Sequence, residues 1–222
     1  HRAFTLFGLN CALIKNNTTL GITTWEHRTM TDYVFDFSNR DAQNNADSLF
    51  VQRWSPRAFE KTSIDDATLE RIMQAARLSP SCFNAQPWRI YTSTDATFDD
   101  YLNLLVEGNQ GWAKDTSVLG FMVATLNFEH NGKPNAWAEF DCGAAWMSLS
   151  LQARMEGLYS HGMGGFKADE AAKYLGLDPE DQKLVMAFSL GKVVDPNSMD
   201  EETSKNETPN ERKPLSEIWL NK

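Results

Sequence analysis

The sequence predicts an α+β or α/β domain in which helices are interleaved with a few strands. Segments with apolar residues at helical spacing alternate with short apolar runs rich in Val, Phe and Thr, which are typical of buried strands. The chain has 222 residues, 41% of them hydrophobic, so it can bury a sizeable core. We find neither internal repeats nor low-complexity tracts.

The first strong element is a helix within residues 63–80. Ser63 and Asp66 resemble a capping box at its start. Pro80 ends it, because the residue before a proline disfavours helical geometry. The alternating, β-prone segment 88–94 then predicts the first strand.

Two longer elements follow in the middle of the chain. Residues 99–113 predict a helix that breaks at Gly108, and the apolar run 117–128 predicts a buried strand. The longest helical pattern covers 135–157, and Gly157 stands where a C-terminal glycine cap belongs. The Ala and Gly content of this helix favours close packing against another helix.

The last part of the chain alternates in the same way. It predicts a short helix over 169–177 and a buried strand over 183–194. A charged loop follows over 194–211, and residues 213–222 would form a terminal strand or arm.

The amino-terminal part has a different character from the rest. We expect residues 1–48 to be an extension that is non-native or disordered, and residues 49–222 to form the domain. Within the extension, residues 1–29 lack a small-x-small cleavage site, so we interpret them as non-native or dispensable rather than as a targeting segment.

Bulk composition excludes several classes of protein. A formal net charge of −9 argues against nucleic acid or an anionic membrane as a partner. No apolar run approaches the roughly 20 residues that span a bilayer, so we expect a cytoplasmic protein. The three cysteines are far apart and the four histidines are scattered, which predicts neither a disulfide scaffold nor a metal site.

The stretch "RWSPRAF" carries the first candidate site residues. Arg53, Ser55 and Arg57 occupy alternate positions, and alternate side chains of an extended segment face the same way. Two guanidinium groups and a hydroxyl on one side would clamp a phosphate or a carbonyl-rich ring. A solvated basic turn explains this motif equally well.

The stretch "SPSCFNAQPW" carries the second group. Ser81, Cys82 and Asn84 follow the helix stop, where short polar side chains usually satisfy the local backbone. Gln86 and Trp88 add an amide and an indole, which together with the hydroxyl would suit a planar heteroaromatic ring.

Three further motifs lie later in the chain. Asn109 in "EGNQGW" would either end a helix in the left-handed conformation or hydrogen-bond a ligand. The glycines of "GMGGF" would either form a plain turn or let a ligand approach the backbone closely. Arg212 and Lys213 are basic residues in an acidic tail. The chain has no G-x-S-x-G, H-E-x-x-H or kinase signature and no evident acid–base pair, so we expect a cofactor to carry the chemistry.

Taken together, "RWSPRAF", "PSCFNAQPW", "GNQGW", "GMGGF" and "NERKPL" in this order resemble the FMN-dependent nitroreductase family. The resemblance covers about residues 50–222. It implies a central, mostly antiparallel sheet surrounded by helices, and a homodimer whose C-terminal arms are exchanged. The long helix at 136–156 would form much of the dimer interface.

The resemblance also implies roles for the site residues. Arg53, Ser55 and Arg212 would hold the FMN phosphate and ribityl chain. Arg57 would lie beside the pyrimidine side of the ring, where its charge would stabilise the anionic reduced flavin, and Asn109 would hydrogen-bond the pyrimidine edge.

Two more groups complete this implied pocket. Gly164 and Gly165 would offer backbone contacts near the reactive ring nitrogen. The turn would reach the flavin from the partner subunit, and its candidate residues are Pro80, Ser81, Cys82, Asn84 and Gln86. Met163 departs from the family, in which many members have an acidic residue before the glycine pair.

The implied activity is ping-pong hydride transfer from NADH or NADPH through FMN to a nitroaromatic, quinone or related small acceptor. No protein side chain would act as the catalytic group. A specialised reaction remains an alternative, whether enone reduction, dehalogenation or flavin breakdown. So do a flavin-binding protein with little turnover and a plain structural domain. The preferred nicotinamide, the physiological acceptor and the lid residues that contact substrate stay open.

Overall fold

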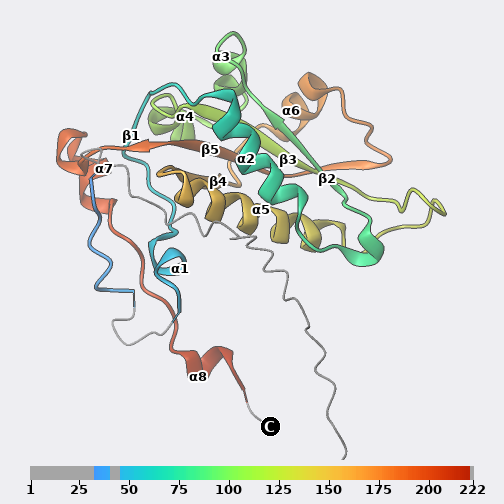
Figure 1. Cartoon of the computed structure of the whole chain (residues 1–222). Coiled ribbons are helices and arrows are strands. Elements are labelled where there is room, and N and C mark those ends of the chain that lie inside the picture. Colours follow the sequence, from blue (N-terminus) through green and yellow to red (C-terminus); the bar gives the residue numbers. More distant parts are fainter. Residues whose placement is uncertain (1–32, 41–45, 221–222) are drawn as a thin grey trace, which may run out of the picture. The chain divides into compact units, whose positions relative to one another are not determined.

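An antiparallel sheet forms the centre of the fold (Figure 1). The structure is a computed structural model that describes residues 33–40 and 46–220, so our expectation for residues 1–29 lies outside the described residues. The strands are β1 (Phe59–Glu60), β2 (Trp88–Thr92), β3 (Val118–Thr125), β4 (Tyr159–Met163) and β5 (Gln182–Val193). Their order is β1–β5–β3–β2, and β4 also pairs with β5.

Every strand pairing within the described residues is antiparallel, and β5 pairs with β1, β3 and β4, whereas β2 pairs with β3. At one end of β5, Val193 pairs with Phe59 of β1, and at the other end Gln182 pairs with Thr125 of β3. Sites that lie near Phe59 and near Thr125 are therefore at opposite ends of this strand.

The helices are α1 (Ser48–Gln52), α2 (Asp66–Arg77), α3 (Phe98–Asn103), α4 (Glu107–Ala113), α5 (Ala138–Met155), α6 (Ala168–Leu175), α7 (Glu201–Asn206) and α8 (Leu215–Ile218), with 3₁₀ turns at Cys82–Asn84 and Pro196–Ser198. The sequence predicted the helices α2 to α6 at these places, but it predicted none at α1, α7 or α8. α7 lies in the predicted charged loop, and α8 is a helix where we expected a strand or arm.

Two details of the predicted helices were wrong. The helix over 99–113 does not break at Gly108, which lies inside α4; the break is at residues 104–106, between α3 and α4. The residue that caps α2 is Asp65 and not Ser63. The Asp65 carboxylate accepts a hydrogen bond from the backbone N–H of Thr68, whereas Ser63 lies too far before the helix start to act as its cap.

The sheet separates two apolar cores. Along β3 the side chains alternate, so that Leu119 and Phe121 belong to one core and Met122 and Ala124 to the other. This strand is buried on both faces, which explains why its sequence is a continuous apolar run rather than an alternation.

One face of the sheet is covered by α2 and α5, which pack side by side (Figure 1). From α2, Ile72 and Ala76 are buried, and from α5 small residues such as Ala145 and Ala153 are completely buried. α5 is followed by Gly157 in the left-handed region at φ +80°, as the sequence predicted.

The other face is covered by α3, α4, α6 and the segment 33–37. Phe35 of this segment is 4% exposed and contacts the rings of Trp54 and Tyr159 edge to face, with centroids 4.7 and 5.7 Å away. The packed unit therefore begins before residue 49, where we had expected the domain to start. No helix of the described residues combines the length and apolarity that a membrane span needs.

Candidate cofactor site

The segment 53–58 presents three polar side chains on one side. It runs without helix or sheet pairing into β1, and Trp54, Pro56 and Ala58 are buried while Arg53, Ser55 and Arg57 are half-buried or exposed. The alternation that we predicted from "RWSPRAF" is confirmed as a matter of geometry. The buried residues hold the segment against the core, so the two guanidinium groups and the hydroxyl are displayed from a fixed backbone.

A buried carboxylate from the tail fixes this segment further. Glu207 is 5% exposed, and its Oε1 accepts hydrogen bonds from the backbone N–H groups of Arg57 and, at 2.7 Å, Ala58. Burial raises the pKa of Glu207, and the two N–H groups and the charge of Arg57 oppose that shift. Glu207 thus ties the chain that leads to Arg212 onto the segment 53–58.

Arginine side chains gather where this tail meets the segment. Burial lowers the pKa of Arg53, and the positive charge of Arg212 lowers it further. Arg40, from the segment before α1, lies close enough for both of these charges to act on it. The structure therefore brings Arg53 and Arg212 into one cationic cluster, although they lie 159 residues apart in the sequence.

Asn109 and the glycine pair form a second group. The Asn109 side-chain amide donates to the Gly165 carbonyl at 2.9 Å, and the backbone N–H of Val106 donates to the same oxygen at 3.2 Å. A Cβ on Gly165 would lie 2.7 Å from Asn109 Nδ2 and 2.9 Å from Val106, so this position needs glycine. A Cβ on Gly164 would meet nothing within 4 Å, so the chain is open there.

His161 connects the two groups, and the sequence analysis did not single it out. Its Nδ1 hydrogen-bonds the carbonyl of Pro56 at 2.7 Å, and its ring lies 4.5 Å from the indole of Trp112 in α4. Burial, foremost, and the charges of Arg57 and Arg53 lower the pKa of His161 to about 4. The ring is therefore neutral at pH 7, and Nδ1–H donates to the carbonyl.

The turn before β2 is tightly constrained. Phe83, Asn84 and Gln86 have positive φ values of 50°, 55° and 47°, which cost conformational energy in residues other than glycine. Ser81 Oγ accepts from the backbone N–H of Gln86, and the Gln86 side chain donates to the Asn84 carbonyl. Such strain persists only where the surroundings fix it, and it is concentrated at functional sites.

The surroundings that fix this turn belong to α5. The carboxylate of Asp141, which is 4% exposed, accepts from the backbone N–H of Cys82 at 3.0 Å. Ser79 donates to Ser148 at 2.8 Å, about two turns further along the same helix. Phe83 remains 83% exposed at the tip of the turn.

Within one chain, the turn does not join the other candidate residues. Phe83 contacts the ring of Phe128, just beyond β3, whereas the segment 53–58 leads into β1 at the opposite end of β5. The length of β5, Gln182–Val193, separates the two ends by roughly 35 Å, at about 3.3 Å per residue. The turn and the arginine cluster therefore cannot hold one small ligand from the same chain.

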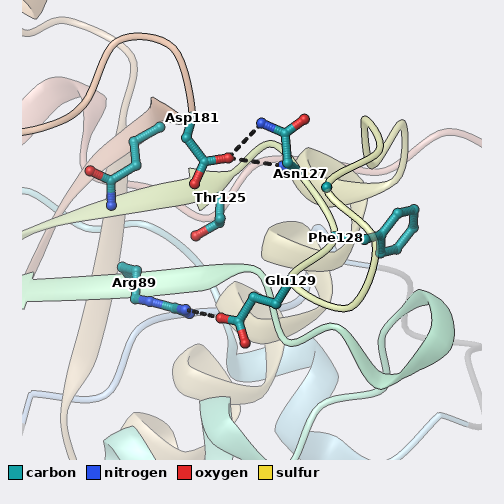
Figure 2. Close-up of a pocket in the computed structure, with 8 residues that line it drawn as sticks. Arg89, Thr125, Asn127, Phe128, Glu129 and Asp181 are labelled. Carbon is teal, nitrogen blue, oxygen red and sulfur yellow. Dashed lines mark hydrogen bonds and ion pairs between the residues drawn. The ribbon is translucent and has the colours of Figure 1, made fainter.

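A pocket of about 410 Å³ lies at the turn's end of the sheet (Figure 2). Figure 2 shows its polar wall, where Arg89 pairs with Glu129 at 3.1 Å and Asp181 accepts from the side chain of Asn127 at 2.7 Å. These groups satisfy one another. None of the predicted site residues lines this pocket.

The structure thus brings together Arg53, Ser55, Arg57 and Arg212 in one group and Asn109, Gly164 and Gly165 in another, and leaves Pro80, Ser81, Cys82, Asn84 and Gln86 apart. Among the described residues, no group of three or more His, Cys, Asp or Glu could hold a metal ion.

Sequence reasoning missed Arg40, Glu207 and His161. The alternating aromatic residues Tyr33, Phe35 and Phe37 were the one signal that the region of Arg40 is packed.

Comparison with known proteins gives the family. The model of the Nitroreductase family matches residues 50–115 and 100–192, which is more than half of the chain. This chain belongs to the nitroreductase family, and the resemblance that the five motifs suggested is confirmed.

Individual relatives agree with this assignment. A crystal structure of an oxidoreductase containing FMN is 34% identical, with a TM-score of 0.78 over 84% of this chain and 96% of that one. An oxygen-insensitive NADPH nitroreductase from Helicobacter acinonychis is 25% identical over 199 residues, 74% of this chain and 95% of the relative. A 5,6-dimethylbenzimidazole synthase from Rhodospirillum rubrum is 42% identical over 62 residues, 28% of each chain.

Proposed function

We propose that this protein is an FMN-dependent NAD(P)H oxidoreductase that reduces nitroaromatic, quinone or related small acceptors. The observation that carries the proposal is the arginine cluster of Arg53 and Arg212, linked through His161 and Trp112 to the Asn109–Gly165 contact. A dianionic phosphate at one end of a ligand and a hydrogen-bonding ring edge at the other match these two groups. Membership of the nitroreductase family and the FMN-containing relative support the same assignment.

The residues present fit the phosphate end of FMN. In the described ranges 33–40 and 46–220, no ion pair joins a carboxylate to the guanidinium of Arg53 or Arg212. Like charges held together without a counter-ion repel, and a phosphate would supply two to three charge-assisted hydrogen bonds. Ser55, beside Arg53, adds a hydroxyl on the same side.

The residues also fit the ring end. Asn109 uses its amide N–H₂ on Gly165, which leaves Oδ1 as an acceptor for an N–H of a ring edge. Gly164 has no neighbour where a Cβ would lie, so a flat ring can approach its backbone. Arg57 is exposed, and its charge acts on His161, which links the segment 53–58 to Trp112 of α4. From this position the charge of Arg57 would stabilise negative charge that develops on a bound ring.

FMN, when bound, supplies the chemistry, since it accepts a hydride from NADH or NADPH and passes it to an acceptor. The protein's task is to bind, orient and shield. The neutral His161 holds the Pro56 carbonyl and so fixes the direction of Ser55 and Arg57, and Glu207 does the same from the tail side. We therefore propose ping-pong kinetics, in which donor and acceptor use the same open face in turn.

We further propose that the protein works as a homodimer with two composite sites. Large apolar side chains are exposed on α5, where Phe140 is 71% and Met155 46% exposed, and a second copy would cover them. The tail ends in an apolar arm whose side chains are about two-thirds exposed: Leu215, Ile218, Trp219 and Leu220. Because the strained turn is remote from the arginine cluster in one chain, the turn of one subunit would complete the site of the other.

A specialised reaction on the flavin is the second candidate. The 62-residue match to a 5,6-dimethylbenzimidazole synthase favours it, because that product carries the dimethylated benzene ring that flavins also contain. Loss of the flavin absorbance during aerobic incubation of the reduced protein would select this candidate. Repeated acceptor turnover with constant flavin absorbance would select the general reductase.

Steady-state kinetics test the proposal directly. The initial rate is measured against NADPH and NADH at several fixed concentrations of a quinone and of a nitroaromatic. Parallel double-reciprocal lines support the ping-pong reductase. Intersecting lines contradict the shared face, and no oxidation of either nicotinamide with any acceptor contradicts the reductase.

A further inference from the structure

Arg40 is a buried arginine that lies outside the matched family region, residues 50–192. Its side chain is anchored by backbone carbonyls from both parts of the arginine cluster. Nη1 donates to the carbonyl of Arg53 at 2.6 Å and to that of Val51 at 3.1 Å, and Nε donates to the carbonyl of Asn210 at 3.1 Å. One guanidinium therefore joins the start of the segment 53–58 to the tail two residues before Arg212.

The segment that carries Arg40 is held independently of these hydrogen bonds. Phe35 packs between Trp54 and Tyr159, and Tyr33 and Phe37 pack on Phe35 with ring centroids 4.9 and 6.4 Å away. Removal of the Arg40 head group should therefore leave the segment docked.

The position of Arg40 is electrostatically expensive. The side chain is 6% exposed, and burial, then the charges of Arg212 and Arg53, lower the pKa of Arg40 to about 10. It stays protonated at pH 7, so three positive charges share one region of the surface. A multivalent anion bound there would interact with more than one of these charges.

We propose that Arg40 is a positioning residue of the cofactor's phosphate site, one that aligns Arg53 and the Arg212 tail so that both converge on a terminal phosphate monoester. This inference rests on the proposed function and adds to it that the segment 33–40 is part of the site. Arg40 acts through the backbone, because its Nη1 and Nε are directed at carbonyl oxygens. The ligand feature it serves is the phosphate and not the ring.

Comparison of two flavins separates this role from a general structural role. FMN and riboflavin share ring and ribityl chain, and only FMN carries the phosphate. The flavin is released from each variant, and the dissociation constants of both flavins are measured by quenching of flavin fluorescence. For Arg40→Ala we expect FMN affinity to fall by about tenfold or more while riboflavin affinity stays within about twofold.

Three further variants sharpen the test. Arg40→Lys keeps the charge and one donor group, so it should recover part of the FMN affinity. Combining Arg40→Ala with Arg212→Ala should cost less than the product of the two separate losses, because Arg40 acts partly through Arg212. Arg77→Ala, at an exposed arginine of α2, is the control and should leave both affinities unchanged.

The outcomes distinguish this inference from the proposed function. If the unmodified protein binds neither flavin, the proposed function fails. If it binds FMN, the inference is overturned by unchanged FMN affinity in Arg40→Ala, or by equal losses for FMN and riboflavin. Should Arg40→Ala not fold, the same criteria apply to Arg40→Lys, in which a loss confined to FMN supports the inference and any other result overturns it.

Discussion

The side-chain amide of Asn109 donates a hydrogen bond of 2.9 Å to the carbonyl oxygen of Gly165. This contact joins α4 to the chain just after β4 and brings together two motifs that lie 56 residues apart. It decides which way the Asn109 side chain faces, since the amide nitrogen is fixed and the oxygen must point elsewhere. The neighbouring glycine, Gly164, has open space beside it.

The two glycines should respond differently to alanine. In Gly165→Ala the new methyl group would overlap Asn109 and Val106, and we expect a loss of about 1–3 kcal/mol in the free energy of unfolding. In Gly164→Ala the free energy of unfolding should be unchanged, while FMN affinity falls because the methyl group occupies the open side. Urea unfolding and flavin titration measure the two quantities. The pair of assignments is wrong if Gly164→Ala binds FMN as well as the unmodified protein does.

Arg53→Ala should weaken FMN binding. The loss of a charge-assisted contact to the phosphate should cost about 1.5–3 kcal/mol, or roughly tenfold to 150-fold in the dissociation constant. Fluorescence titration of FMN checks this, with Arg77→Ala as the matched control. Unchanged FMN affinity in Arg53→Ala would remove Arg53 from the phosphate site.

His161 should make stability depend on pH in the acidic range. The pKa of His161 falls from 6.5 in the unfolded chain to about 4 in the folded protein. Between these values the unfolded chain binds the proton more readily, so stability is lost as the pH drops from 6.5 to 4, by at most about 3 kcal/mol. In His161→Gln, this part of the pH dependence should be absent from the urea-unfolding profile.

The carboxyl group of Glu207 changes stability with pH in the opposite direction from His161. The raised pKa of Glu207 favours its protonated form in the folded state, so that its contribution improves as the pH falls. Subtracting the pH profile of the unfolding free energy of His161→Gln from that of the unmodified protein isolates the contribution of the histidine, because Glu207 is present in both proteins. Parallel stability profiles of the two proteins would show that His161 is not the group responsible.

Glu207 should also matter for the tail at neutral pH. Glu207→Ala leaves the backbone N–H groups of Arg57 and Ala58 without their acceptor, at a cost of about 1–3 kcal/mol in the free energy of unfolding. FMN affinity should fall as well, because the tail that carries Arg212 is released. Glu207→Gln retains an acceptor oxygen and should lose less of both. Equal losses in the two variants would mean that the carboxylate's charge, and not its hydrogen bonds, holds the tail.

The proposed dimer predicts that oligomeric state and flavin content change together. Phe140→Asp places a charge in the exposed apolar face of α5 and should shift the protein toward monomers in sedimentation experiments. Bound FMN per chain should fall with it. Tyr174→Ser, at a 44%-exposed aromatic on α6, is the control and should stay dimeric. A Phe140→Asp monomer with full flavin content would contradict composite sites.

Local patterns predicted those parts of the fold and site that depend on neighbours in the sequence. The strand of residues 118–125 and the glycine that ends α5 followed from apolar periodicity and capping. The shared direction of Arg53, Ser55 and Arg57 followed from the geometry of an extended chain.

The rest depends on contacts between distant parts of the chain. Glu207 stands in an acidic tail, and nothing in its neighbours indicates that it caps backbone N–H groups 150 positions earlier. Arg40 stands in a polar stretch that we expected to be an extension, because burial of Phe35 against Trp54 and Tyr159 is a tertiary contact. The sheet order, with β4 beside β5, is likewise set by packing and not by local propensity.

The central claim is that this chain binds FMN and uses it to oxidise NAD(P)H. The measurement that tests it most directly is the visible absorption spectrum of the purified protein, supplied with FMN, before and after anaerobic addition of NADPH and then NADH. We predict a flavin spectrum that is lost on addition of at least one nicotinamide and returns when a quinone is added. A protein that retains no flavin after gel filtration, or whose flavin spectrum persists with both nicotinamides, would contradict the account.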